Sequence, residues 1–145
     1  MIYVLFGPPG VGKTYVGKLI SRAFKMSFFD ADELYTDELR QRITDGTYSQ
    51  EDRDRFVSAL VDEVSRMSED GKDLVLAEAF TKEQNRAEFI RKFSNARFVL
   101  VLAPYPVAKE RAVERLHFSD HIIDVDNVDR FWNEFLYTRH FSLFL

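Results

Sequence analysis

Gly7-Pro8-Pro9-Gly10-Val11-Gly12-Lys13-Thr14 is the stretch that decides the fold, because it matches the phosphate-binding (Walker A) pattern G-x-x-x-x-G-K-[ST] at all four fixed positions. The apolar run at residues 2–6 before it is typical of a buried strand. The segment after it predicts a helix with one apolar face, made by Val16, Leu19, Ile20, Ala23 and Phe24. Strand, glycine loop and helix in this order are the context in which the pattern is specific. We therefore expect this P-loop to bind a nucleotide polyphosphate.

The chemistry of the loop explains its composition. Gly7 and Gly12 permit backbone torsions that turn N–H groups toward an anion, and the following helix adds its unpaired N–H groups and positive dipole end. Lys13 supplies a full positive charge and a catalytic contact to the β- and γ-phosphates, while the Thr14 hydroxyl is a hard-oxygen ligand for Mg²⁺. The whole of 7–14 is thus the predicted ATP site, with ATP and Mg²⁺ as cofactors.

Composition limits the classes of partner. The 145 residues predict a single domain spanning 1–145, and 46% apolar with 30% charged residues is ordinary for a globular protein. A net charge of −4 argues against duplex nucleic acid as the main partner. The chain has no cysteine, so thiolate metal sites and cysteine nucleophiles are excluded. The first apolar run is too short for a signal peptide, and no run is long enough to span a membrane. We expect a cytoplasmic protein without a membrane partner.

Strand-like runs alternate with helical patterns along the chain, which is typical of a parallel α/β sheet. Strands are predicted near 2–6, 26–29, 74–77, 97–102 and 121–125. Helices are predicted near 15–24, 32–44, 49–67, 81–93 and 106–116, and from Asp126, with Ser49 and Asp52 as a capping box. The apolar tail 141–145 could pack on the sheet, form an oligomer contact, or mark where a longer chain was cut.

Carboxylates follow two of the predicted strands. Asp30 and Asp32 end the second strand and Glu78 ends the third, and ligands of such sheets gather beyond the carboxyl ends of strands. A phosphoryl transferase needs one carboxylate near Mg²⁺ and another to accept the proton of the attacking hydroxyl. Asp32 taken alone is equally well explained as a helix cap, but the pair beside a P-loop favours the functional interpretation.

The chain resembles the small P-loop kinases of the gluconate kinase and shikimate kinase group over roughly residues 1–118. Gluconate kinases carry Asp-Gly-Asp-Asp-Leu-His after the second strand, where this chain has Asp30-Ala31-Asp32-Glu33-Leu34-Tyr35. Their Gly-x-Pro-Leu-x-Asp-x-Asp-Arg segment is similar to 46–53, which ends in Arg53. Their later arginine helix and His-Phe pair look like Arg111, Arg115 and 117–118.

The resemblance implies a three-layer P-loop NTPase fold with a five-stranded parallel sheet of order 2-3-1-4-5 and helices on both faces. It also implies Asp30 near Mg²⁺, Asp32 as catalytic base or substrate-hydroxyl partner, and Arg53 on the polar groups of the acceptor. Arg111 or Arg115 would reach the transferring phosphates, although for all three arginines a solvated surface position explains the pattern nearly as well.

Two departures bear on the acceptor. The Ser-Ala-Leu-Lys segment of gluconate kinases is replaced by Glu78-Ala79-Phe80-Thr81, with Lys82 displaced by one position. The lid after the arginine helix is shortened to about 117–120, and lids exclude water and complete the charge clamp.

The sequence therefore predicts an ATP-dependent phosphotransferase that acts on a hydroxyl of a small polar metabolite such as a sugar acid. A nucleoside or nucleotide kinase, which shares the scaffold, is one alternative. A nucleotide-binding regulator or slow NTPase is the other, favoured by the short lid.

Overall fold

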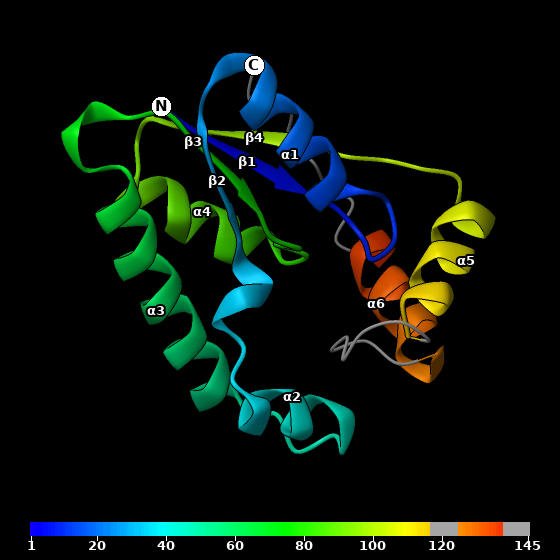
Figure 1. Cartoon of the computed structure of the whole chain (residues 1–145). Helices are drawn as coiled ribbons and strands as arrows, with labels where there is room; N and C mark the ends of the chain where they lie inside the picture. Colours follow the sequence, from blue (N-terminus) through cyan, green and yellow to red (C-terminus); the bar gives the residue numbers. More distant parts are fainter. Residues whose placement is uncertain (117–124, 138–145) are drawn as a thin grey trace.

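A parallel four-stranded sheet of order β2-β3-β1-β4 forms the centre of the computed structural model, which describes residues 1–116 and 125–137 (Figure 1). Its strands are β1 (Ile2–Phe6), β2 (Ser27–Asp30), β3 (Leu74–Ala77) and β4 (Ala96–Leu100). The α/β class, the parallel pairing and the order of the first four strands are confirmed. The fifth strand predicted at 121–125 lies outside the described residues except for Val125, which begins a helix instead.

Helices on both faces make the three predicted layers. The helix α1 (Lys13–Phe24) covers one face, and α3 (Gln50–Met67) with α4 (Glu83–Lys92) covers the other (Figure 1). The main core fills the second interface with Ile2, Val4, Phe56, Leu60, Val64, Leu74, Leu76 and Phe89, all nearly inaccessible to solvent. The strands β1 and β3 are covered on both faces and read as continuous apolar runs, which is why the sequence predicted them well.

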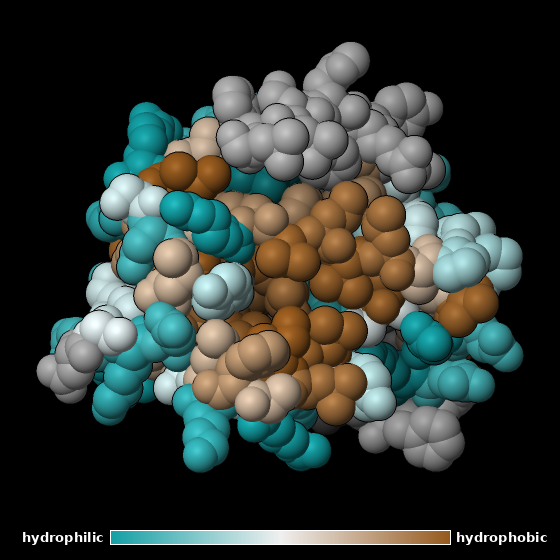
Figure 2. Space-filling view, turned by 90° about the horizontal axis from the view of Figure 1, so that it is seen from above, coloured by the Kyte–Doolittle hydropathy of each residue, from teal (hydrophilic) through white to brown (hydrophobic). Residues whose placement is uncertain are grey.

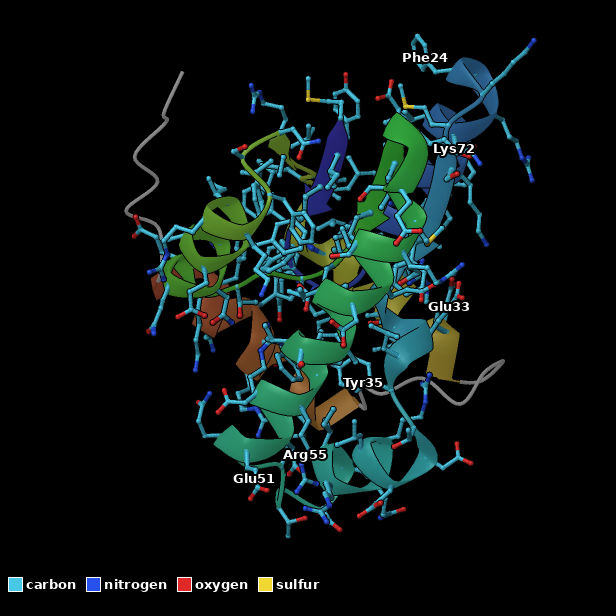
Figure 3. The ribbon with its side chains drawn as sticks, turned by 90° about the vertical axis from the view of Figure 1, so that its left-hand side faces the viewer. Phe24, Glu33, Tyr35, Glu51, Arg55 and Lys72 are labelled. Carbon is cyan, nitrogen blue, oxygen red and sulfur yellow. The ribbon has the colours of Figure 1, made fainter. Side chains whose placement is uncertain are left out.

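The apolar face predicted for α1 is only partly the face that packs. Gly17 is the buried residue of this helix, and a Cβ there would lie 2.3 Å from the Phe28 ring. Leu19 and Phe24 are exposed instead, and Figure 3 shows Phe24 pointing away from the body of the molecule. Because α1 approaches β2 through a glycine, the face of the helix that packs is not the face that carries its larger side chains.

The single helix predicted over 32–44 is wrong, because the segment breaks into two pieces. A 3₁₀ turn, η1 (Ala31–Leu34), is followed by an extended Tyr35 and then by α2 (Asp37–Thr44). The Thr36 hydroxyl accepts a hydrogen bond from the Leu39 N–H and so begins a new helix. The break lets the Tyr35 ring stack on Phe56 of α3, with ring centroids 4.3 Å apart.

The predicted capping box of α3 is confirmed. Ser49 Oγ accepts from the Asp52 N–H at 3.2 Å, and Asp52 Oδ2 accepts from the Ser49 N–H at 2.9 Å. Arg42 of α2 pairs with the buried Asp52 carboxylate at 3.2 Å, so the same residue ties α2 to the start of α3. A second 3₁₀ turn, η2 (Glu69–Gly71), then leads into β3.

A second apolar cluster joins the P-loop to α5 (Tyr105–Leu116) and α6 (Val125–Tyr137). Its buried members are Val11, Ala108, Ala112, Val128 and Trp132. The Trp132 indole N–H donates a hydrogen bond to the Pro9 carbonyl at 3.1 Å. Of the apolar face predicted for the last helix, Val128, Trp132 and Phe135 are core, whereas Phe131 lines the cavity. Trp132 holds the P-loop directly.

Apolar side chains also reach the surface on the face seen in Figure 2. Exposed large apolar residues of the described part include Leu19 and Phe24 of α1 and Val99 of β4. The tail 141–145, for which packing on the sheet, an oligomer contact and the cut end of a longer chain were the alternatives, lies outside the described residues. Among the helices of the described part, none is both long enough and apolar enough to cross a membrane.

Candidate active site

The P-loop lines a cavity of about 430 Å³ at the carboxyl ends of the strands. Gly10 and Gly12 have φ of 78° and 99°, the left-handed region that glycine enters without strain. Val11 turns inward to the second apolar cluster, while Pro9, Gly10 and Gly12 line the cavity. Successive inward-turned N–H groups at a helix start suit a polyphosphate.

Lys13 begins α1 and folds back over the loop. Its Nζ donates to the carbonyls of Gly7 at 2.9 Å and Pro8 at 3.1 Å. Burial lowers the pKa of Lys13, and the negative charges of Asp32 and Glu78 oppose that shift. The ammonium group is thus held beside the loop by two carbonyls that an anion can replace.

Thr14 and Asp30 are brought together as predicted for a metal site. The Thr14 hydroxyl donates to Asp30 Oδ2 at 2.6 Å, and Asp30 Oδ1 accepts from the Asp32 N–H at 3.2 Å. A hydroxyl and a carboxylate are the hard-oxygen donors that suit Mg²⁺, which takes few protein ligands and keeps water and phosphate for the rest. The described residues contain no cluster of three or more His, Cys, Asp or Glu that could hold a metal ion.

Asp32 faces the same cavity from η1. The cap of η1 is Asp30, not Asp32, so the alternative of Asp32 as a mere helix cap loses its basis. Although the residue as a whole is exposed, desolvation of its carboxyl group by neighbouring atoms raises the pKa of Asp32 to about 6. The Asp30 charge adds to the shift and Lys13 opposes it. A carboxylate with a pKa near neutrality is well matched to accepting a proton from a hydroxyl.

Arg53 lines the opposite side of the cavity, on the first turn of α3. Its guanidinium lies 3.4 Å from Glu78 Oε1 and 5.2 Å from the centre of the Phe56 ring. Glu78 is buried at the end of β3, and its second oxygen accepts from the Phe80 N–H. The interpretation of Arg53 as a freely solvated surface residue is therefore wrong, since its side chain is only 20% exposed.

The family assignment follows from comparison with known proteins. The family model described as "AAA domain" matches residues 2–133. The chain belongs to this AAA domain family. Among curated proteins it is 28% identical over 86 residues to a gluconokinase of Arabidopsis thaliana, covering 59% of the chain and 46% of the relative. It is 30% identical over 91 residues to a probable gluconokinase of Xenopus tropicalis, covering 62% and 48%. The chain spans about half the length of the curated relatives it matches.

Solved structures confirm the fold of this AAA domain. A gluconokinase from Sinorhizobium meliloti 1021 superposes with a TM-score of 0.70 at 21% identity, covering 91% of this chain and 73% of the other. A shikimate kinase from Acinetobacter baumannii, solved in complex with shikimate, gives 0.66 at 18% identity, covering 95% and 75%. The predicted resemblance to the gluconate and shikimate kinase group is confirmed by these similarities.

The predicted arginines of α5 take different positions in the AAA domain. Arg115 lines the cavity, close enough to Lys13 to oppose its charge. Arg111 is exposed and is not among the lining residues. Sequence reasoning missed Arg130 of α6, which also lines the cavity. The only available signal was its place next to the apolar stripe of that helix, which does not tell an inward arginine from a solvated one.

Two tyrosines of the cavity were also missed. Tyr35 and Tyr48 line this cavity, and Figure 3 shows Tyr35 between α3 and the segment that follows η1. By contrast, the pair Glu51 and Arg55 lies at the outer end of α3 in the same view. Tyr35 stands at the last position of the quoted six-residue match, where the family pattern has histidine.

Proposed function

We propose that this AAA domain transfers the γ-phosphate of Mg·ATP to a hydroxyl of a small polar metabolite, with sugar acids as the reference acceptors. The observation that carries the proposal is the grouping of Lys13, Thr14, Asp30 and Asp32 around one cavity. In this cavity the Thr14 hydroxyl and the Asp30 carboxylate lie 2.6 Å apart, so two oxygen ligands are close together beside the P-loop. The gluconokinase relatives support the choice of acceptor class.

In this proposal the P-loop N–H groups and Lys13 hold the β- and γ-phosphates, with Lys13 exchanging two carbonyl partners for phosphate oxygens. Thr14 and Asp30 would hold Mg²⁺. The metal ion supplies neutralisation of phosphate charge. Arg115 and Arg130 add positive charge from the other side of the cavity.

Asp32 orients the acceptor hydroxyl and takes its proton. Because burial raises its pKa to about 6, Asp32 is ionised at pH 7 yet basic enough to accept a proton as the bond to phosphorus forms. Positioning and electrostatic stabilisation supply most of the rate in phosphoryl transfer, so the correct grouping of these residues matters more than any one of them.

A coupled ADP-release assay over sugar acids, polyols, nucleosides and nucleotides tests the proposal. We expect acceptor-dependent ADP release in the wild type and none in Lys13→Ala, which controls for contaminating kinases. Acceptor-independent hydrolysis across the whole panel would instead support the nucleotide-binding regulator. Release with nucleosides or nucleotides alone would support the second kinase interpretation.

A further inference from the structure

The acceptor side of the cavity contains a neutral ion pair where a carboxylate-binding site needs net positive charge. Arg53 Nη1 lies 3.4 Å from Glu78 Oε1, and both side chains are largely withdrawn from solvent, at 20% and 5% exposure. Burial opposes the charge on Arg53, but Glu78, Tyr35 and Tyr48 outweigh this effect and raise its pKa. The guanidinium is therefore charged, and its charge is already balanced within the protein.

Glu78 is fixed in this position. Its Oε2 accepts a hydrogen bond from the Phe80 N–H, at a residue whose φ of 40° is unusual for phenylalanine. A carboxylate that approached Arg53 would meet the Glu78 charge in a poorly solvated site. Like charges at short range in such a site repel strongly, which selects against an anionic ligand.

The neighbouring groups are uncharged hydrogen-bonding groups. The Tyr48 hydroxyl is buried beside Arg53 and Tyr35 without a hydrogen-bond partner of good geometry among the described residues. Burial raises the pKa of Tyr35 well above 10, so its hydroxyl stays protonated and can donate. Uncharged hydroxyls of this kind suit an alcohol ligand, which can both donate to and accept from them.

We propose that the acceptor is an uncharged polyhydroxylated molecule, a sugar or polyol, and that Glu78 selects it over the corresponding acid by neutralising Arg53. This inference rests on the proposed phosphotransferase function, and it replaces the sugar acids named there as reference acceptors by their neutral counterparts. It also offers a chemical reason why this chain has Glu78 where the gluconate kinase pattern has serine.

Lys82 is the group that could support the opposite preference. It lines the cavity at the start of α4, exposed to solvent, and a sugar acid could place its carboxylate there. A solvated lysine discriminates weakly because water and salt screen its charge. The buried pair is therefore expected to decide the specificity, and a Lys82 variant serves as the control.

The test compares kcat/KM for two matched pairs of acceptors, D-glucitol with D-gluconate and D-glucose with D-glucuronate, in wild type, Glu78→Gln and Lys82→Ala. We expect the wild type to favour the neutral member by at least about tenfold. Glu78→Gln keeps an oxygen to accept from Phe80 and removes the charge, so it should shift the ratio toward the acid by at least about tenfold. Lys82→Ala should leave the ratio within about twofold.

The outcomes separate the two proposals. The wild-type ratio needs no variant, so it decides the inference even if Glu78→Gln fails to fold. Lys13-dependent transfer that favours the acids, or a folded Glu78→Gln with an unchanged ratio, overturns the inference and leaves the phosphotransferase proposal standing. Absence of Lys13-dependent transfer to any member of the wider panel overturns both.

Discussion

Gly10→Ala should destabilise the protein far more than another glycine with a similar backbone, because α5 rests directly on the P-loop. A Cβ at Gly10 would lie 1.9 Å from the Ala108 carbonyl oxygen and 2.7 Å from its carbon, both backbone atoms that no rotamer change can move. Carbon does not approach oxygen closer than about 3 Å, so helix and loop must separate by roughly 1 Å. The separation opens the cluster that contains Val11 and Trp132.

The loss of stability expected for Gly10→Ala has two parts. A side chain at φ of 78° costs about 1–2 kcal/mol on its own. Forcing the packed contact apart adds about 1–3 kcal/mol, as overpacking does in well-packed cores. Gly71→Ala is the matched control, since its φ is 69° and a Cβ there meets nothing within 4 Å.

Thermal unfolding of both variants measures the difference. At about 2–4 °C per kcal/mol for a chain of this size, Gly71→Ala should lower the Tm by about 2–8 °C and Gly10→Ala by about 4–20 °C. The ATP affinity of Gly10→Ala should fall as well, while that of Gly71→Ala stays unchanged. Equal losses of Tm in the two variants would refute the reasoning, because the contact with α5 would then contribute nothing.

Four further predictions concern single side chains. Asp32→Asn should lower phosphoryl transfer by roughly 10²–10⁴-fold with ATP affinity unchanged, in the coupled assay and by calorimetry; full activity would exclude a base role. The pKa of Asp32 is about 6 in the folded state, against an ordinary 3.8. Its stabilising contribution is therefore complete below pH 3.8 and is lost as pH rises through about 6. The Tm of Asp32→Asn, without metal or nucleotide, should therefore match the wild type near pH 4 and exceed it above pH 6; a difference independent of pH would contradict this. Lys13→Ala should abolish turnover and weaken ATP binding by calorimetry, and unchanged affinity would remove Lys13 from the phosphate site. Ser49→Ala should cost about 1 kcal/mol through loss of the capping box, read from chemical denaturation, whereas the control Ser65→Ala in the last turn of the same helix should not; equal losses would contradict the capping role.

Much of the fold could be predicted because it depends on local pattern. The four central strands are apolar runs between clear turn signals, and the P-loop and the Ser49 capping box are defined by residues close together in sequence. The face of α1 could not be predicted this way. Gly17 contributes no hydrophobicity, yet it decides how closely the helix approaches β2 through Phe28. The break at Tyr35 depends likewise on stacking with Phe56, a partner 21 positions away that spacing does not reveal.

The candidate site likewise contains some contacts that the sequence could predict and others that it could not. The grouping of Thr14 and Asp30 follows from strand ends meeting at one edge of a parallel sheet, so the sequence could predict it. The pairing of Arg53 with Glu78 could not be predicted, since it joins a helix turn to a strand end across 25 positions. A choice between Arg111 and Arg115 likewise required the rotation of α5 about its axis, which a loosely amphipathic pattern leaves open.

The hydrogen bond from Trp132 to Pro9 makes the protein its own optical probe. Trp132 is the single tryptophan of the chain, and it lies buried with its indole N–H on a P-loop carbonyl and its ring edge-on to Tyr105. Indole emission depends on the polarity and hydrogen bonding around the ring, so any nucleotide that rearranges the loop alters the fluorescence of one defined chromophore. Binding can therefore be followed in the unlabelled wild type, in real time and at low protein concentration.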